Sequence, residues 1–460
     1  MLKLRRWILS FDLQTLPGLA LLIRFAPASW KYGKSYKKTL KLIWNNNSGF
    51  LDVESYQREK YHELATRFNK TKFSDTFGKV DPAVSAILKT KIMRTADLPA
   101  NPQDLCSENL DTLEMCSSSG SSGFPKTFYL GIDRGPIETA FVHFAWKSAG
   151  FKHSDVRAVF RGLDNLTDNR KDFDWKPLLQ ELQISPFRML ESNLASIWGE
   201  ISRRKIKFFQ GYPSALEVLA KWVINQEIDL PSRRRISGLL FNSEELHQHQ
   251  IELFEMAFPN ADAVSFYGLS EKTAFAQQDT KDRTVYNFSP IYGVTELLDE
   301  SGSPVLSPGQ TGYLYSTGLL FKGSAFVRYE LGDRAELVSP ATAENNFVLS
   351  VKKIQSRWGE TLVMGKNGVN ISLAAVNLHA QELTDFSRIQ FVQRTPGELE
   401  ILLVPRPGIT SARATLIEKK IQDKAGASLD VRAVLVESIN LNSRGKAKLF
   451  ISLIGKSHEE

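Results

Sequence analysis

A run of hydroxyl residues and glycines between residues 118 and 127 offers the clearest chemistry in this sequence. The run reads Ser118-Ser119-Gly120-Ser121-Ser122-Gly123-Phe124-Pro125-Lys126, followed by Thr127. The glycines let the backbone turn tightly and approach a ligand, so that neighbouring N–H groups can face one concavity suited to an anion. The hydroxyls add donors, and Lys126 adds a mobile positive charge able to meet a phosphate. Apolar residues before the run (Leu113, Met115) and after it (128–130) predict a loop between two buried strands.

Three other interpretations of this run are a flexible linker, a Walker loop and a nucleophile elbow. A flexible Ser/Gly linker has a similar composition and stays an alternative on this stretch alone. A Walker loop is excluded because two residues separate Gly123 from Lys126. A hydrolase nucleophile elbow is excluded because the interval from Gly120 to Gly123 is one residue too short.

The run does fill every position of a known pattern: two hydroxyl residues, glycine, two hydroxyl residues, glycine, any residue, proline and lysine. It therefore resembles the phosphate loop of the adenylate-forming (acyl-CoA synthetase) superfamily. Four further motifs of that superfamily follow in order, and the resemblance extends over about residues 56–454. Within the superfamily the chain is most similar to the phenylacetate–CoA ligase branch and its capsule-biosynthesis relatives, which share the phrase Gly211-Tyr212-Pro213-Ser214.

Two of the further motifs follow expected buried strands, where α/β sheets place ligand contacts. Strand 238–242 leads into Ser243-Glu244, which the resemblance places beside the adenine. The alternative is that Glu244 only begins the helix expected over 246–258, whose dipole favours an acid there. Strand 263–266 leads into Tyr267-Gly268-Leu269-Ser270-Glu271.

The chemistry expected of this second motif follows from its residue types. Tyr267 offers a flat face to a purine, Gly268 allows close backbone approach, and Ser270 completes the nucleotide-binding motif. Glu271 offers a hard oxygen ligand for Mg²⁺ that bridges phosphates, and we assign it a catalytic and metal-binding role.

The last motifs lie in the carboxyl-terminal half. Asp333, in Arg328-Tyr329-Glu330-Leu331-Gly332-Asp333, can accept hydrogen bonds from two ribose hydroxyls. The resemblance gives Arg357 a nucleotide contact, although Ser356 replaces the usual glycine, which leaves the hinge position open. It also makes Lys446 the catalytic lysine that enters the site during adenylation, with Lys448 close by.

Composition predicts a multidomain globular protein, since 460 residues exceed one typical core. Hydrophobic residues make up 42% and charged residues 24%, and the net charge of +7 suits polyanionic ligands such as nucleotides. Two cysteines exclude a disulfide framework or a cysteine-rich metal site and favour a cytoplasmic location. The basic residues are dispersed rather than striped, so a nucleic-acid partner is the least favoured interpretation.

The amino-terminal segment, residues 1–50, is expected to be a basic and aromatic docking segment. Its apolar stretch from Leu16 to Phe25 contains Arg24 and is shorter than the ~20 residues of a membrane span. A signal peptide is not favoured, because no clean apolar core precedes a small-residue cleavage site. Lysines and arginines among Trp7, Phe11, Trp30 and Trp44 leave peripheral membrane contact open as an alternative to protein docking.

The expected fold is α/β, with a large amino-terminal domain of mixed sheets and helices (51–354) and a small, mobile carboxyl-terminal α/β domain (355–460). Periodicity predicts helices over 52–70, 137–149, 190–204, 217–223 (capped by Ser214) and 412–425, and strands over 156–160, 389–392, 399–404 and 431–436. Residues 164–175 are expected to form an irregular loop, and 285–340 to be rich in strands.

The resemblance implies an ATP-dependent ligase that joins a small carboxylic acid to AMP, releases pyrophosphate, and then forms a thioester with CoA. ATP, Mg²⁺ and CoA are therefore the expected cofactors. Transfer of the acyl group to an amine or hydroxyl, for example on a sugar in polysaccharide biosynthesis, is the first alternative. A nucleotide-binding scaffold that has lost catalysis is the second. The acid itself and the oligomeric state are not readable from the sequence.

Overall fold

The computed structural model describes residues 24–118, 126–160, 172–242, 244, 246–355, 362–366, 368, 370–373, 385–406, 408–439 and 450–454. The described chain contains five β-sheets, of which the two largest have seven and six strands. The α/β class expected from the sequence, with a large amino-terminal part and a smaller carboxyl-terminal one, is confirmed.

Helices and short 3₁₀ turns form the amino-terminal part. They are α3 (Ala28–Asn47), α4 (Val53–Phe68), α5 (Phe73–Phe77), η2 (Val84–Lys89), η3 (Thr95–Asp97), η4 (Pro102–Leu105) and η5 (Leu110–Thr112). The Asp52 side chain accepts a hydrogen bond from the backbone N–H of Ser55, which satisfies a donor at the start of α4. Within the described residues, no helix is both long and apolar enough to cross a membrane.

A six-stranded sheet forms one half of the large part. Its strands are β3 (Arg157–Phe160), β4 (Phe173–Lys176), β5 (Glu181–Ile184), β6 (Phe208–Gly211), β7 (Gly238–Phe241) and β8 (Asp262–Val264). The helices in this stretch of the chain are α6 (Arg134–Trp146), α7 (Glu191–Arg203), α8 (Pro213–Asn225), α9 (Leu230–Arg234) and α10 (Gln248–Ala257), with turns η6 (Lys147–Ala149) and η7 (Pro186–Arg188). The order is β4-β5-β3-β6-β7-β8, and only β4 runs antiparallel to its neighbour. Every residue of β7 is buried, as expected for a parallel strand covered on both faces.

A seven-stranded antiparallel sheet forms the other half. Its strands are β9 (Phe266–Gly268), β10 (Phe275–Gln278), β11 (Val285–Phe288), β12 (Gly293–Leu298), β13 (Thr311–Gly318), β14 (Tyr329–Ser339) and β15 (Ser350–Gln355), in the order β12-β13-β14-β15-β11-β10-β9. The chain passes from β8 of the parallel sheet to β9 of this one at Ser265, whose N–H donates to the Gln278 side chain over 2.7 Å. The motif at 267–271 therefore lies where the two sheets meet.

The hairpin β1 (Leu113–Ser118) and β2 (Lys126–Gly131) stands beside the seven-stranded sheet. The N–H of Gly131 donates to the carbonyl of Lys322 over 2.9 Å, which ties the hairpin to the loop after β13. Because Ser118 pairs with Lys126, the two ends of the expected phosphate loop are held together.

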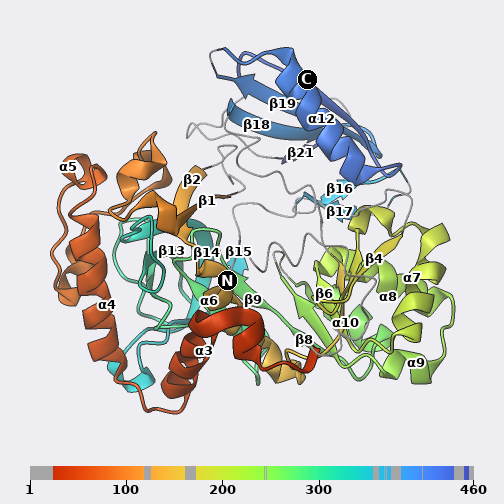
Figure 1. Ribbon diagram of the computed structural model, residues 1–460, viewed down its shortest axis with the longest axis horizontal. Coiled ribbons are helices and arrows are strands. Elements are labelled where there is room, and N and C mark those ends of the chain that lie inside the picture. Colours follow the sequence, from red (N-terminus) through yellow and green to blue (C-terminus); the bar gives the residue numbers. More distant parts are fainter. Residues whose placement is uncertain are drawn as a thin grey trace.

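The carboxyl-terminal part is a compact α/β unit. It consists of β18 (Phe386–Gln393), β19 (Glu398–Pro405), α12 (Ser411–Ala425), β20 (Asp430–Leu435) and β21 (Phe450–Ser452), with the strand order β20-β19-β18-β21. It is preceded by the hairpin β16 (Leu362–Met364) and β17 (Asn370–Ser372). In Figure 1 this unit lies above the two larger sheets, with the antiparallel sheet on the left and the parallel sheet on the right.

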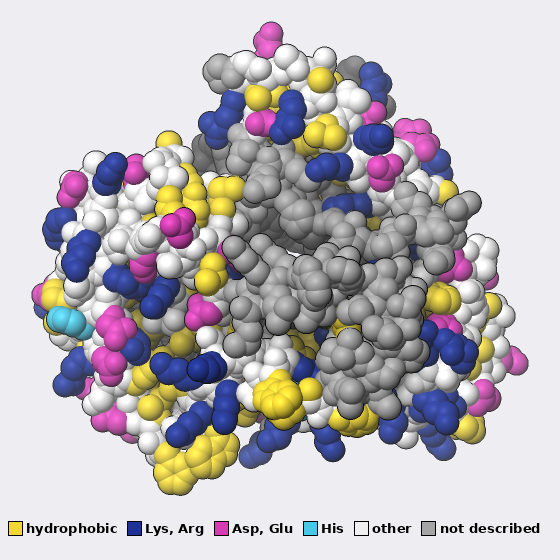
Figure 2. Space-filling view, viewed as in Figure 1, with side chains coloured by type: hydrophobic (Ala, Val, Ile, Leu, Met, Phe, Trp, Pro, Cys, Tyr) yellow, Lys and Arg dark blue, Asp and Glu magenta, His cyan; other side chains and the backbone are white. Residues whose placement is uncertain are grey.

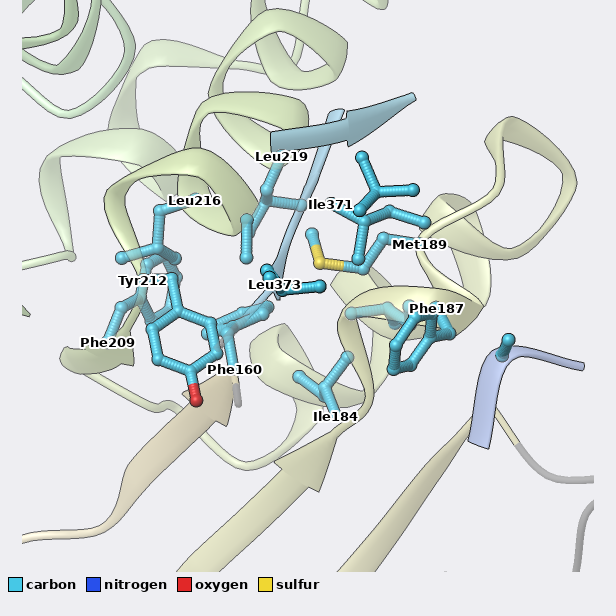
Figure 3. Packing of buried hydrophobic residues seen from close by; sticks show 14 of the residues in the cluster. Phe160, Ile184, Phe187, Met189, Phe209, Tyr212, Leu216, Leu219, Ile371 and Leu373 are labelled. Carbon is cyan, nitrogen blue, oxygen red and sulfur yellow. The ribbon is translucent and has the colours of Figure 1, made fainter. Parts of the chain in front are cut away.

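The hairpin β16–β17 packs against the parallel-sheet half. Figure 3 shows Ile371 and Leu373 facing Leu216 and Leu219 of α8 within one apolar cluster, close to Met189. Ile371 is only 3% exposed and Leu373 only 6%. The hairpin is thereby part of the contact between the small and large parts.

Three local expectations were wrong. Met115 is 40% exposed, because a two-stranded hairpin covers only one of its faces. Residues 173–176, expected within an irregular loop, form β4 and pair with β5. Ser214 does not cap α8: the N-cap is Tyr212, and Ser214 lies inside the first turn.

Candidate nucleotide-binding site

Lys126 is the described end of the expected phosphate loop. It is the first residue of β2, and its Nζ donates to the backbone carbonyl of Thr95 in η3. Ser118 is described as the last residue of β1. The remaining expected phosphate-binding residues lie outside the described residues: Ser119, Gly120, Ser121, Ser122 and Gly123.

A short chain of contacts leads from Lys126 to Glu271. The Thr95 hydroxyl lies 3.3 Å from the Tyr329 hydroxyl, which in turn lies 3.4 Å from Oε1 of Glu271. Tyr329 is the first residue of β14 and is 3% exposed. The segment before η3 is held in place because the N–H of Met93 donates to the Arg328 carbonyl over 3.1 Å. Residues separated by more than 200 positions in the sequence thus meet at one place.

Asp333 joins this group through Tyr267. The Tyr267 hydroxyl donates to Oδ2 of Asp333 over 2.6 Å, a short bond typical of an ionised acceptor. Asp333 lies at a register shift between β13 and β14, next to Gly332 with φ of +85°. A β-bulge re-aims side chains, and glycine is the residue that adopts this φ without strain.

The bond between Tyr267 and Asp333 requires the seven-stranded sheet to curl. Three strands (β10, β11 and β15) separate β9 from β14. In a flat sheet, four strand spacings would place β9 and β14 about 19 Å apart, which is beyond the reach of the two side chains. The Tyr267 ring also packs edge-on against Phe288 of β11, with centroids 5.5 Å apart. Curvature therefore gathers Tyr267, Glu271 and Asp333 on the same side of the sheet.

Glu271 lies close to two other charged residues, Asp333 and Lys126. Burial raises the pKa of Glu271 above its usual range, and the nearby negative charge of Asp333 raises it further. The Tyr329 hydroxyl and the positive charge of Lys126 act in the opposite direction on this pKa. An anionic Glu271 is therefore costly here, and a cation close to both carboxylates would relieve the repulsion.

Comparison with known proteins defines the fold. Residues 363–452 match the model of the CapK C-terminal domain family. The structure of 2-hydroxyisobutyryl-CoA ligase with 2-HIB-AMP and CoA in the thioesterification state is 16% identical, covers 86% of this chain and 88% of its own, and superposes with a TM-score of 0.50. The chain therefore shares the fold of this acyl-CoA ligase structure, and its residues 363–452 are similar to the CapK C-terminal domain family.

Two further structures were matched at lower similarity. The same ligase in its postadenylation state with R3-HIB-AMP is 15% identical, with coverage of 86% and 88% and a TM-score of 0.47. An acyl-CoA synthetase from Brucella canis is 15% identical, with coverage of 73% of this chain and 62% of its own and a TM-score of 0.34. A search of curated protein sequences found no match.

Glu244 lies beside the first turn of α8. Its Oε2 accepts from the backbone N–H of Ser214 over 3.1 Å, and its Oε1 accepts from the Ser214 hydroxyl over 3.1 Å. A carboxylate at this place satisfies orphan donors of the first turn of α8 and complements its dipole. Because α10 begins only at Gln248, the alternative that Glu244 belongs to the following helix is wrong. The adenine contact stays a prediction.

Gly268 and Ser270 are both exposed. A Cβ at Gly268 would meet nothing closer than 3.8 Å, so the packing of the protein does not itself require glycine there. Close approach of a ligand remains the physical reason for a glycine at this position. Ser243, Arg357 and Lys446, which were predicted to bind the nucleotide or to catalyse the reaction, lie outside the described residues.

The structure adds residues to which the sequence analysis gave no role. Thr95 and Tyr329 link Lys126 to Glu271, as described above. Immediately after Glu271, Lys272 has a left-handed φ of 57° and pairs with Glu138 of α6 over 2.8 Å. The Tyr292 hydroxyl donates to the same carboxylate over 2.7 Å, which anchors the loop that carries Glu271. Only the hydroxyl of Tyr329, inside a recognised motif, could have suggested any of these contacts.

The carboxylates near Glu271 could contribute only part of the ligands of a Mg²⁺ ion. Among the described residues, no cluster of three or more His, Cys, Asp or Glu side chains could hold a metal by itself. Mg²⁺ is usually bound by one or two carboxylates together with substrate phosphates, rather than by an all-protein cage. A partly buried Glu271 beside a second carboxylate fits an ion that arrives with a nucleotide.

Proposed function

We propose that this protein activates a small carboxylic acid with ATP, forming an acyl-adenylate and pyrophosphate, and then transfers the acyl group to CoA. The observation that carries the proposal is the meeting of Lys126, Glu271 and Asp333, which come from three separate segments, next to a tyrosine already bound to Asp333. A cation, a metal-binding carboxylate and a ribose-binding carboxylate are the groups that a bound Mg·ATP needs.

In the proposed reaction, a carboxylate oxygen attacks the α-phosphorus, an O–P bond forms, and the bond to pyrophosphate breaks. Both reactants are anions, so the protein contributes mainly charge neutralisation and alignment. Lys126 and the loop from Ser118 would hold the leaving phosphates, Asp333 with Arg357 would hold the ribose, and Ser243, Glu244 and Tyr267 would border the adenine. Bound Mg²⁺ would be held by Glu271 and would neutralise phosphate charge.

Lys446 would supply positive charge to the α-phosphate and the attacking carboxylate during adenylation. We propose that the division into residues 1–50, 51–354 and 355–460 describes the working units. Rotation of the last unit would then withdraw Lys446 and admit the acceptor. In the second step the CoA thiol attacks the acyl carbon, a C–S bond forms, and AMP leaves. A cytoplasmic location, where ATP and CoA are available, fits this chemistry.

A second candidate differs only in the acceptor. The CapK C-terminal domain match over 363–452, together with the resemblance at 211–214 to capsule-biosynthesis relatives, favours an amine or hydroxyl as acceptor in polysaccharide biosynthesis. The complex of 2-hydroxyisobutyryl-CoA ligase with an acyl-AMP and CoA supports CoA instead, through the shared fold. The two candidates predict the same first half-reaction and different products.

The decisive experiment is a pyrophosphate-release screen with aromatic, aliphatic and amino carboxylic acids, each with and without CoA. We expect at least one acid to release pyrophosphate and to drive ATP–pyrophosphate exchange. Mass spectrometry of the product would then distinguish a CoA thioester from an acyl-adenylate that awaits another acceptor.

The matched control is the same reaction without any acid, which must release only background pyrophosphate. If no acid in a broad panel gives exchange although the protein binds Mg·ATP, the protein is a nucleotide-binding scaffold. If it binds neither ATP nor AMP, the proposed function is wrong.

A further inference from the structure

One face of α3 is positively charged. This 20-residue helix contains Lys31, Lys34, Lys37, Lys38 and Lys41 and no acidic residue. Lys34, Lys37, Lys38 and Lys41 are exposed, and their spacing of three and four residues places them along one side of the helix. Since Trp44 follows Lys41 by three residues, it continues the same stripe. We call Lys34, Lys37, Lys38, Lys41 and Trp44 the α3 stripe.

The opposite face of α3 is fixed to the body of the protein. Tyr36, Thr39 and Ile43 are buried, and the helix packs against α6. The Tyr36 hydroxyl lies 3.0 Å from Nδ1 of His143 on α6. The apolar face of α3 is thus already used, so the helix presents its α3 stripe outward in a defined orientation.

Large aromatic side chains protrude beside the α3 stripe. Trp44 is 55% exposed and Phe50 is 73% exposed, and their ring centroids lie 5.4 Å apart. Trp30, before the kink at Gly33, is 79% exposed. Figure 2 shows hydrophobic side chains next to Lys and Arg side chains at the lower edge of the molecule, where Figure 1 places α3.

We propose that the α3 stripe, with Trp30 and Phe50, docks on an anionic lipid bilayer. Lysines that face one way bind the negative surface of such a membrane, and exposed tryptophans prefer the headgroup region. The sequence before α3 adds positive charge, with Lys3, Arg5 and Arg6 against the single Asp12. Because the buried face of α3 stays on α6, the contact is peripheral rather than inserted.

The observations favour a bilayer over an acidic protein or a nucleic acid. Protruding rings gain free energy from a headgroup layer that accepts them at any lateral position, whereas a folded partner would need pockets that match them. Each lysine close to an anionic membrane strengthens binding by about fivefold. The four lysines and the aromatic side chains together are therefore sufficient for reversible attachment.

The test is co-sedimentation of the full-length protein with vesicles of phosphatidylcholine alone and of phosphatidylcholine mixed with phosphatidylserine. We expect binding only to the mixed vesicles, weakening as salt is raised. Lys37→Glu with Lys41→Glu should reduce binding to the mixed vesicles at least 25-fold, by the per-lysine factor above. Trp44→Ser with Phe50→Ser should reduce it while the salt dependence is retained.

The matched control is Lys72→Glu with Lys419→Glu, which makes the same charge change at exposed lysines immediately before α5 and near the middle of α12. This pair should bind mixed vesicles within about twofold of the unchanged protein, since neither position lies on α3. Circular dichroism melts verify that every variant is folded.

Three results would overturn the proposal: equal binding to both kinds of vesicle, equal loss in the control pair, or binding to an oligonucleotide or polyglutamate with none to vesicles. Vesicle binding is measured without ATP, so its outcome does not depend on whether the proposed ligase function is correct.

Discussion

Replacing Asp333 with asparagine separates a nucleotide-binding role from a structural one. The change keeps the shape of the side chain and an oxygen that can accept a hydrogen bond from the Tyr267 hydroxyl. In the unchanged protein this hydroxyl lies 2.6 Å from Oδ2 of Asp333. The change removes the negative charge that would accept hydrogen bonds from the ribose. Hydrogen bonds to charged groups contribute about 1.5–3 kcal/mol each, so losing two of them costs at least about 3 kcal/mol. The dissociation constant for Mg·ATP should therefore rise at least roughly 100-fold.

The stability of the unliganded protein should respond differently. Asp333 is 7% exposed and its charge disfavours ionisation of Glu271. Asparagine removes that repulsion while weakening the bond from Tyr267, so the two effects offset each other. We expect the free energy of unfolding to change by less than about 1 kcal/mol. Affinity and stability are thus expected to separate in this one variant.

Isothermal titration calorimetry with Mg·ATP and urea denaturation measure the two quantities. Glu336→Gln is the control, because Glu336 lies three residues further along β14 and pairs with Lys352 and Lys353. It should leave ATP affinity unchanged. The reasoning is refuted if Asp333→Asn binds Mg·ATP as the unchanged protein does. It is also refuted if the variant loses several kcal/mol of stability, because Asp333 would then be structural.

Variants at three other places test the assigned lysine, the assigned metal-binding glutamate and a buried ion pair of the fold. Lys446→Ala should abolish acid-dependent ATP–pyrophosphate exchange with ATP binding retained, whereas Lys448→Ala should retain exchange; normal exchange without Lys446 excludes its assigned role. The pKa of Glu271 in the folded protein lies above its usual range, so protons compete with Mg²⁺ for this carboxylate at a higher pH than for an ordinary glutamate. Mg·ATP affinity should therefore fall on acidification at a pH where ordinary glutamates are still ionised. A Glu271→Gln variant that shows the same pH profile would contradict this. Glu296→Ala should cost about 3–5 kcal/mol in urea denaturation because it leaves the buried Arg328 unpaired, and Glu296→Leu with Arg328→Met should recover most of the loss.

Sequence patterns predicted the candidate site residues that lie at strand ends and belong to recognisable motifs. Lys126, Glu271 and Asp333 were grouped through the resemblance of their motifs to those of the adenylate-forming superfamily, and the structure places them close together. Their proximity depends on the curl of the sheet and the bulge at Gly332. The glycine was visible in the sequence, but its left-handed conformation was not.

Contacts made through the backbone, or between segments far apart in the chain, have no recognisable pattern in the sequence. Thr95 meets Lys126 through its carbonyl oxygen, an atom that every residue has. Glu244 satisfies the first turn of α8 from a segment 30 residues away, so a serine within that turn was mistaken for the cap. Met115 was predicted to be buried because alternation alone does not reveal that a hairpin lacks a second covering layer.

Packing around the hairpin β16–β17 constrains the proposed domain rotation. The hairpin is tied to the small unit, because the Gln393 side chain bonds both the N–H and the carbonyl of Met364 over 2.7 Å. It is also seated on α8 through Ile371 and Leu373. Burial of two such side chains contributes about 3–6 kcal/mol. If the hairpin moved with the small unit, this burial free energy would be lost. The loss is comparable to the ~5.5 kcal/mol of differential binding that shifts a two-state equilibrium from 1:99 to 99:1.

A second contact adds to this constraint. The Ser428 hydroxyl, which precedes β20, donates to the carbonyl of Phe187 over 2.6 Å, and both residues are buried. Either pivot would break this bond. A pivot near residue 355 would also expose the hairpin, whereas a pivot after Leu373 would leave the hairpin on α8 and break its bonds to Gln393. Either way, a rotation that carries Lys446 into or out of the site must be driven by differential binding of ATP, acid or acceptor, because packing alone favours the arrangement seen here.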